Sequence, residues 1–294
     1  VVVYLRRRVK GVKMDSMWAI PEAIIDCHWL KDRYDRQDIR IYDCTSYLHY
    51  TDEHPSQPYD VVSGFDNYCR SHIPNAAFLD LQQGLSENNS PYSFTIPALH
   101  DLAERFKKQG VGEPFHIILY SANGMQWATR IWWMLYAVGY QRVSILNGGF
   151  AAWQEAGLPT QESITKWEPA EFEARPKPNI FVGKQRVLDA IADEKTVLLN
   201  ALTSDLHLGK SARYGRPGRI PTSLNIPFTS FMKNGLDDIR SASEAQQILA
   251  EHGLSPDTDI VNYCGGGIAA TLNAFVMLQL GFSDLQIYDN SMSE

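Results

Sequence analysis

The sequence contains few cysteines and no long apolar run. Only four cysteines occur among its 294 residues, with no CxxC pair and no His/Cys cluster at the spacing of zinc ligands. This scarcity argues against a disulfide scaffold and favours a reducing cytoplasm. The longest apolar stretches, such as residues 131–139, fall well short of the roughly 20 residues that a membrane-spanning helix requires. We therefore expect a cytoplasmic protein with no membrane segment, no metal site and no cofactor.

Basic residues are also in short supply. The chain has 27 Lys and Arg against 34 Asp and Glu, a net charge of −7, and this acidic balance would repel a nucleic-acid backbone. We therefore expect no nucleic-acid partner. The first thirteen residues are an exception, because they carry five basic residues and no acidic one. They lack the apolar core of a targeting peptide, so residues 1–16 are interpreted as a disordered leader.

The length and composition fit a folded protein of two domains, and the sequence repeats itself once. A strand-like segment at 115–121 and another at 258–264 each lead into a loop of small residues. A helix with apolar residues at helical spacing follows in both places. The helices stop near Gly139 and Gly281, residues suited to a left-handed C-terminal cap. This pattern indicates a duplicated strand, loop and helix.

Further matches keep the same order in both halves. They pair residues 40–44 with 198–202, 71–81 with 218–228, and 143–146 with 285–288. Strands that alternate with helices predict an α/β fold with a mostly parallel sheet in each half. The first half has the longer connections, mainly in TDEHPSQPYDVVSG. We assign residues 17–160 to a first domain, 161–178 to a linker and 179–294 to a second domain.

Chemistry is predicted at Cys264, which closes a strand-like segment and precedes a glycine-rich loop and a helix. The loop residues are Gly265, Gly266, Gly267, Ile268 and Ala269. A thiolate at a helix N-terminus is stabilised by unpaired N–H groups and by the helix dipole. Glycines let successive N–H groups turn toward one anion. Such a loop would stabilise a thiolate and equally a persulfide anion.

Two other interpretations of this loop stay open. A buried structural cysteine beside a glycine turn would give the same pattern. A phosphate-binding loop would require Lys and Ser or Thr after its glycines, whereas Ile268 and Ala269 stand there.

The other three cysteines lack a comparable loop. Cys27 lies in the helix-like PEAIIDCHWL, Cys44 follows a strand but precedes no glycine, and Cys69 is placed in a polar loop. Cys264 alone is therefore predicted to react.

Several motifs resemble the rhodanese superfamily, in particular its two-domain thiosulfate and 3-mercaptopyruvate sulfurtransferases. HIPNAAFLDL and RPGRIPTSLNIPF are similar to a motif that the family has in each domain. YSANGMQWATRIWWML resembles the noncatalytic first domain, and YCGGGIAA resembles the catalytic loop of the second. The resemblance extends from about Met17 to the end of the chain and implies two tandem rhodanese-like domains.

The resemblance also implies roles for single residues. Cys264 would be the sulfur-accepting nucleophile, and the amides of the five residues after it would form its cradle. Ser121 holds the corresponding position of the first domain, where a hydroxyl has no accessible anion near neutral pH, so that domain is expected to be noncatalytic. Asp80, in FLDL, matches an acid that faces the active site in mercaptopyruvate enzymes. A capping or solvated carboxylate is the alternative.

The chain departs from the family pattern at several positions. Gly266 stands where mercaptopyruvate enzymes carry a hydroxyl, and Leu202 and Leu206 stand where arginine is usual. Basic residues that follow shortly afterwards are predicted to supply the donor-binding charge instead, with a solvated loop as the alternative; the candidates are Arg213, Arg216 and Arg219. The C-terminal helix of the family is missing after YDNSMSE.

These observations favour an enzyme that moves sulfur from a small anionic donor to cyanide, a small thiol or a protein thiol through Cys264. A rhodanese-like binding or regulatory module that has lost catalysis is the main alternative. Related cysteine phosphatases end a longer loop in arginine, whereas Ala270 is the sixth residue after Cys264. A tetrahedral oxyanion would therefore lack its charged partner.

Overall fold

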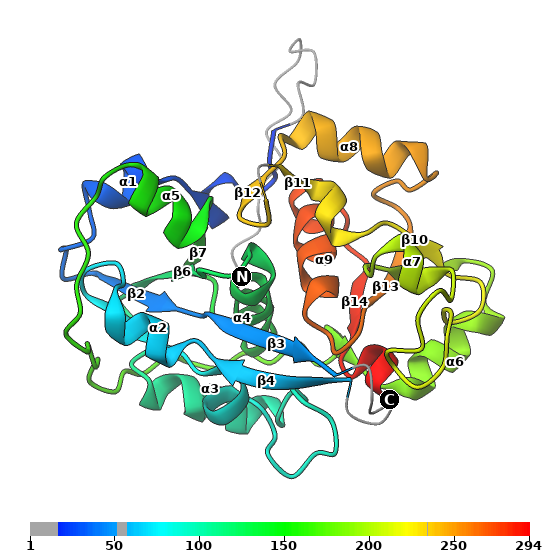
Figure 1. Ribbon diagram of the computed structural model, residues 1–294, viewed down its shortest axis with the longest axis horizontal. Coiled ribbons are helices and arrows are strands. Elements are labelled where there is room, and N and C mark those ends of the chain that lie inside the picture. Colours follow the sequence, from blue (N-terminus) through cyan, green and yellow to red (C-terminus); the bar gives the residue numbers. More distant parts are fainter. Residues whose placement is uncertain (1–16, 52–57, 234) are drawn as a thin grey trace.

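The computed structural model describes residues 17–51, 58–233 and 235–294, and the leader assigned to residues 1–16 lies outside them. Two parallel sheets of five strands dominate the structure (Figure 1). The order of the first is β1 (Ile24–Ile25), β7 (Val143–Leu146), β6 (His116–Tyr120), β2 (Ile39–Asp43) and β5 (Ala76–Phe78). The order of the second is β10 (Leu224–Asn225), β9 (Thr196–Asn200), β13 (Asp259–Tyr263), β14 (Leu285–Tyr288) and β8 (Phe181–Val182). The predicted α/β fold in each half is confirmed.

Helices flank both sheets. Those of the first half are η1 (Pro21–Ala23), α1 (Cys27–Lys31), α2 (Phe65–Arg70), η2 (Leu81–Leu85), α3 (Leu99–Lys108), α4 (Met125–Val138) and α5 (Gly149–Glu155). Those of the second half are α6 (Lys184–Ala192), α7 (Ser204–His207), η3 (Phe228–Phe231), α8 (Ala242–Glu251), α9 (Ala269–Gln279) and η4 (Ser291–Ser293). Two antiparallel pairs complete the elements, β3 (Ser46–Tyr50) with β4 (Tyr59–Ser63) and β11 (Met232–Lys233) with β12 (Asp238–Ile239).

The two halves meet at helices α4 and α9, which pack against each other between the sheets (Figure 1). Both helices are apolar on nearly all sides because each is covered by its own sheet and by the other helix. The Thr129 and Thr271 hydroxyls are 2.9 Å apart across this contact, and the Trp133 indole donates to the Thr271 carbonyl at 3.0 Å. The tryptophans of α4 are all buried and serve core and interdomain packing.

Two local expectations were wrong. PEAIIDCHWL is no single helix, because it divides into η1, β1 and α1, with β1 pairing with β7. Cys69 lies in α2 rather than in a polar loop. Tertiary packing decides both, since each segment is short and its propensity is weak. The long connection TDEHPSQPYDVVSG also contributes the second strand of the β3–β4 hairpin, in which Tyr50 pairs with Tyr59.

The segment 161–178 runs along the first half of the molecule. Gln161 pairs with His72, Thr165 with Ala77 and Glu171 with Glu113 in isolated bridges. Farther on, the amides of Arg175 and Lys177 donate to carbonyls at the end of α4, at 2.9 and 2.7 Å. This segment therefore packs against the first sheet and caps α4 before the chain enters the second sheet.

Candidate active site

Cys264 follows strand β13, at the edge of the second sheet where the carboxyl ends of its parallel strands meet. This edge is the usual position of a site in an open α/β sheet. Its side chain is 2% exposed, and its amide donates to the Ser291 hydroxyl at 3.0 Å. The Met292 amide in turn donates to the Cys264 carbonyl at 3.2 Å. The short helix η4 therefore fixes the backbone that presents the thiol.

The loop after Cys264 turns its amides away from the protein's own acceptors. Within the described part of the chain, the N–H groups of residues 265–268 donate to no carbonyl or side chain. Gly267 has φ +73°, and a Cβ there would collide with the Asp289 carbonyl, so only glycine fits. Unpaired amides this deep in a protein require a partner. The loop can therefore hold an anion beside Cys264, which is the geometry that the sequence predicts.

The corresponding loop of the first domain is already satisfied. Its amides at Ala122 and Asn123 donate to the hydroxyls of Thr45 and Ser121, at 2.8 and 3.0 Å. The Gly124 amide donates to a carboxylate oxygen of Asp237 at 3.0 Å, and Asp237 comes from the second half of the chain. An internal carboxylate therefore occupies the position that an external anion would take. The amides of the first-domain loop are thus paired, whereas those of the Cys264 loop have no partner among the described residues. The sequence carries no signal for this difference, because the position of Asp237 depends on how the two halves dock.

A small cavity of about 90 Å³ opens on Cys264. Both domains line it, through Leu48, Tyr50, Tyr59, Gln126, Leu202, Tyr214, Phe228, Cys264, Gly265, Gly266, Ile268 and Ala269. A bound water occupies about 10–15 Å³ of such space, so the cavity admits a molecule of only a few atoms. Among the described residues that line it, no side chain carries a formal charge apart from the Cys264 thiol when ionised.

Sequence reasoning missed two tyrosines that reach the loop. A Cβ added at Gly265 would collide with the Tyr214 hydroxyl, and one at Gly266 would collide with the Tyr59 hydroxyl. The glycines therefore make room for two phenols as well as for the turn. Tyr59 belongs to the β3–β4 hairpin, which reaches from the first domain toward the second (Figure 1). The extra length of this connection in the first half was the available signal.

The three candidate arginines lie in different places. The Arg213 guanidinium carbon stacks 3.9 Å from the centre of the Tyr50 ring, and its Nε is buried without a partner among the described residues. Arg216 is exposed and lines a separate pocket beside α6 and η4. Arg219 is exposed near His207, whose pKa is lowered first by burial and then by this charge. Of the three, only Arg213 contacts a side chain that lines the Cys264 cavity.

Asp80 caps a helix. Its carboxylate accepts a hydrogen bond from the Gln83 amide at 2.8 Å, at the start of η2, and another from the Ser63 hydroxyl at 2.7 Å. It is absent from the residues that line the Cys264 cavity. The structure thus shows the capping carboxylate that the sequence left as an alternative, and a role of Asp80 in the site stays a prediction.

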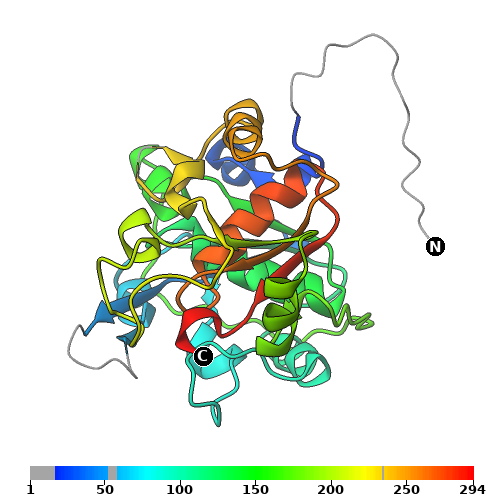
Figure 2. The same cartoon turned by 90° about the vertical axis from the view of Figure 1, so that its right-hand side faces the viewer.

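Arg130 joins the two domains directly behind the loop. The residue is fully buried, and its Nη2 lies 2.6 Å from an Asp289 carboxylate oxygen and 2.6 Å from the Phe94 carbonyl. Its Nη1 donates to the Gly267 carbonyl at 3.2 Å. Figure 2 shows the C-terminal end of the chain against the first-domain segment before α3, where the Ile96 amide donates to Asp289 at 2.8 Å. A lone arginine in an apolar helix was the sequence signal for such a pair.

Two of the other cysteines, Cys44 and Cys27, are less suited to react. Burial raises the pKa of Cys44 well above its ordinary value, with a further rise from Asp43. Burial, together with Asp26, raises the pKa of Cys27 to about 11. A thiol with a raised pKa holds little thiolate at neutral pH.

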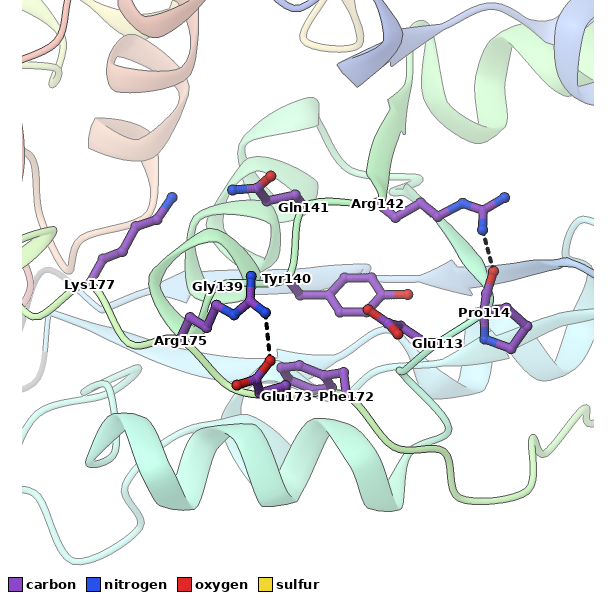
Figure 3. A pocket seen from close by; sticks show the side chains of 10 residues that line it. All are labelled: Glu113, Pro114, Gly139, Tyr140, Gln141, Arg142, Phe172, Glu173, Arg175 and Lys177. Atoms are coloured by element: carbon purple, nitrogen blue, oxygen red, sulfur yellow. Dashed lines mark hydrogen bonds and ion pairs between the residues drawn. The ribbon is translucent and has the colours of Figure 1, made fainter. Parts of the chain in front are cut away.

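A larger pocket of about 590 Å³ lies at the opposite end of α4, around Gly139 and Tyr140 (Figure 3). Its cations are engaged elsewhere, since Arg175 pairs with Glu173, Arg142 donates to the Pro114 carbonyl and Lys177 lies over the Tyr136 ring. Among the described residues that line it there is no cysteine. This pocket therefore offers no thiol for sulfur transfer.

The described residues contain neither a metal-binding group of three or more His, Cys, Asp or Glu side chains nor a helix with the length and apolar character that crossing a membrane requires.

Comparison with known proteins agrees with the repeat. A 3-mercaptopyruvate sulfurtransferase from mouse is 32% identical over 285 residues, which cover 92% of this chain and 91% of the mouse protein. A thiosulfate sulfurtransferase from chicken is 26% identical and covers 94% of each chain. The crystal structure of the 3-mercaptopyruvate enzyme SseA from Escherichia coli superposes with a TM-score of 0.77 at 27% identity, covering 92% of this chain and 99% of that one. The model of the rhodanese-like domain matches twice, at residues 26–156 and 185–294. The chain therefore belongs to the rhodanese-like domain family and carries its domain in two tandem copies.

Proposed function

We propose that this protein is a sulfurtransferase that carries a sulfane sulfur as a persulfide on Cys264. One observation carries the proposal: a buried thiol faces a small cavity, beside loop amides that donate to no acceptor in the described chain. The same amides that stabilise the thiolate can stabilise the persulfide anion, since both place negative charge on sulfur within the loop. The first-domain loop has Ser121 and an internal carboxylate instead, so one domain of the two is active.

Thiosulfate illustrates the reaction. The Cys264 thiolate attacks the outer sulfur, a new S–S bond forms, and the S–S bond of the donor breaks. The electron pair of the broken bond leaves with sulfite, and the outer sulfur remains on Cys264 as a persulfide anion. A nucleophilic acceptor such as cyanide or a thiolate then attacks that sulfur and restores the thiolate. No cofactor enters this sequence.

The cavity volume supports a small donor of the class that the relatives' names indicate, thiosulfate or 3-mercaptopyruvate. Arg213 is the donor-binding cation of the proposal, because its guanidinium covers the Tyr50 ring at 3.9 Å and its Nε has no partner in the described part of the chain. A cation beside the cavity offsets part of the cost of bringing an anion into an acidic protein. The acceptor is cyanide, a small thiol or a protein thiol, and the expected compartment is the cytoplasm.

Steady-state sulfur transfer to cyanide tests both parts of this proposal. The wild type should turn over with thiosulfate or 3-mercaptopyruvate, and Cys264→Ser should not. Arg213→Ala should raise the KM for the donor about tenfold, as expected for a lost charged contact, while Arg213→Lys retains part of the affinity. Arg216→Ala is the matched control, since Arg216 lies in the same loop but lines another pocket. Equal KM values for the Arg213→Ala and Arg216→Ala variants would contradict the role of Arg213.

The main alternative is a catalytically inactive binding or regulatory module. The sulfurtransferase relatives, which match over most of the chain, favour the enzyme. A wild-type protein that binds thiosulfate without any turnover or sulfur loading would instead support the binding module.

A further inference from the structure

The β3–β4 hairpin of the first domain reaches into the active site of the second. The strands pair antiparallel with Tyr50 opposite Tyr59, and both residues line the cavity on Cys264. Tyr59 is 4% exposed, and its hydroxyl touches the place where a side chain at position 266 would begin. The hairpin therefore places the Tyr59 hydroxyl against Gly266, in the middle of the loop that follows Cys264.

Aromatic contacts fix the orientation of this phenol. The Tyr59 ring stacks on Phe94 with the ring centres 6.2 Å apart, and Phe94 packs edge-on against Trp127 at 5.6 Å. Tyr50 meets Tyr59 edge-on at 6.1 Å, and Arg213 covers the Tyr50 ring. Because the ring is held on several sides, a change of hydroxyl to hydrogen at Tyr59 leaves its packing in place.

The hydroxyl is a hydrogen-bond donor across the physiological range. Burial raises the pKa of Tyr59 to about 12; a hydrogen bond with the Ser293 side chain lowers it, and the Cys264 thiolate raises it further. The same thiolate contributes to the raised pKa values of Tyr50 and Tyr214, after burial as the main cause. All three phenols are therefore within electrostatic reach of the sulfur and remain protonated while it is ionised.

We infer that the Tyr59 hydroxyl donates a hydrogen bond to the ionised sulfur of Cys264, in the thiolate and in the persulfide. The inference rests on the proposed function and adds a residue from the noncatalytic domain to the active site. Among the described residues no cationic side chain lines the cavity, so the groups that face the sulfur directly are dipoles, namely the loop amides and the phenols, with Arg213 behind the Tyr50 ring. No proton is transferred in this role, because the phenol only donates a hydrogen bond.

Tyr59→Phe tests the inference, and Tyr47→Phe is its matched control. Tyr47 lies on the same hairpin, where its hydroxyl contacts Asn67 and does not line the cavity. The pH dependence of Cys264 alkylation by iodoacetamide, followed by peptide mass spectrometry, reports the stability of the thiolate. A hydrogen bond to a charged group is worth a factor of about ten or more. Tyr59→Phe should therefore lower the rate of Cys264 alkylation about tenfold at pH values where the thiolate fraction limits the rate, and slow sulfur loading from thiosulfate by the same factor under those conditions.

Tyr47→Phe should change neither quantity. Equal alkylation profiles for the wild type and Tyr59→Phe would overturn the inference, as would an equal shift in both variants, which would indicate a general effect on the hairpin. The alkylation profile reads the thiolate in the absence of any donor. A wild type that takes up no sulfur therefore contradicts the proposed function, while the profile still decides the role of Tyr59.

Discussion

Arg130 offers a quantitative test of how the two domains hold the active loop. The change to methionine keeps an unbranched side chain of similar reach but removes the guanidinium. The Asp289 carboxylate, which is 9% exposed, then loses its cationic partner. The carbonyls of Phe94 and Gly267 lose a donor at the same time. Arg130→Met therefore removes a buried charge from the junction of α4, the loop and the C-terminal segment.

The expected cost follows from burial. Removing one partner of a buried ion pair costs about 3–5 kcal/mol, because the remaining charge stays buried without compensation. Arg36 and Asp38 form an exposed pair at 2.8 Å, with side chains 55% and 39% exposed. Loss of such a surface pair should change the stability little, because water screens both charges. The loss of unfolding free energy in Arg130→Met, compared with the loss in Arg36→Met, therefore reports the effect of burying the ion pair.

Urea unfolding of the wild type, Arg130→Met and Arg36→Met measures these costs. Adding Asp289→Asn completes a double-mutant cycle, in which the combined loss should fall short of the sum of the single losses by about 1–3 kcal/mol. An Arg130→Met variant as stable as Arg36→Met, or strictly additive losses in the cycle, would refute the assignment of this pair as an interdomain tie.

Two further predictions concern backbone and charge. Gly267→Ala should abolish sulfur loading, because Gly267 has φ +73° and the new Cβ would collide with the Asp289 carbonyl. Gly281 has φ +90° but faces open space, so Gly281→Ala should lower the stability and leave sulfur loading intact. Equal sulfur loading by the two variants would contradict this explanation. Burial raises the pKa of Asp43 to about 6, so the folded state holds this proton more tightly than the unfolded chain, and the associated stability is lost as the pH rises from about 4 through 6. The shift of about two units corresponds to about 3 kcal/mol. The stability at pH 4.5 relative to pH 7, measured by urea unfolding, should therefore be lower in Asp43→Asn than in the wild type, and an unchanged relative stability would count against the buried carboxyl.

Much of the fold was predictable because its signals are local. The strands at 143–146 and 285–288 coincide with β7 and β14, since short apolar runs between a glycine-capped helix and a turn leave few alternatives. Gly139 adopts φ +90° at the end of α4, as a left-handed cap requires. The internal repeat supported these predictions further, because every element predicted in one half indicated a counterpart in the other.

The site was predictable only where its residues are neighbours in the sequence. Cys264 and its glycines form one continuous motif, so the sequence alone predicts them as the site. Tyr59 lies about two hundred positions away, and Asp237 fills a loop of the opposite domain. Their positions depend on how α4 docks on α9, which is a property of side-chain shape across the whole interface rather than of any local pattern.

The most direct test of the account is to locate the transferred sulfur. The wild-type protein is incubated with thiosulfate or 3-mercaptopyruvate, its intact mass is recorded, and its peptides are mapped under conditions that preserve persulfides. The account predicts a gain of one sulfur atom, found on the peptide of Cys264 and absent from Cys264→Ser. A sulfur atom mapped to Cys27, Cys44 or Cys69 with none on Cys264 would contradict it.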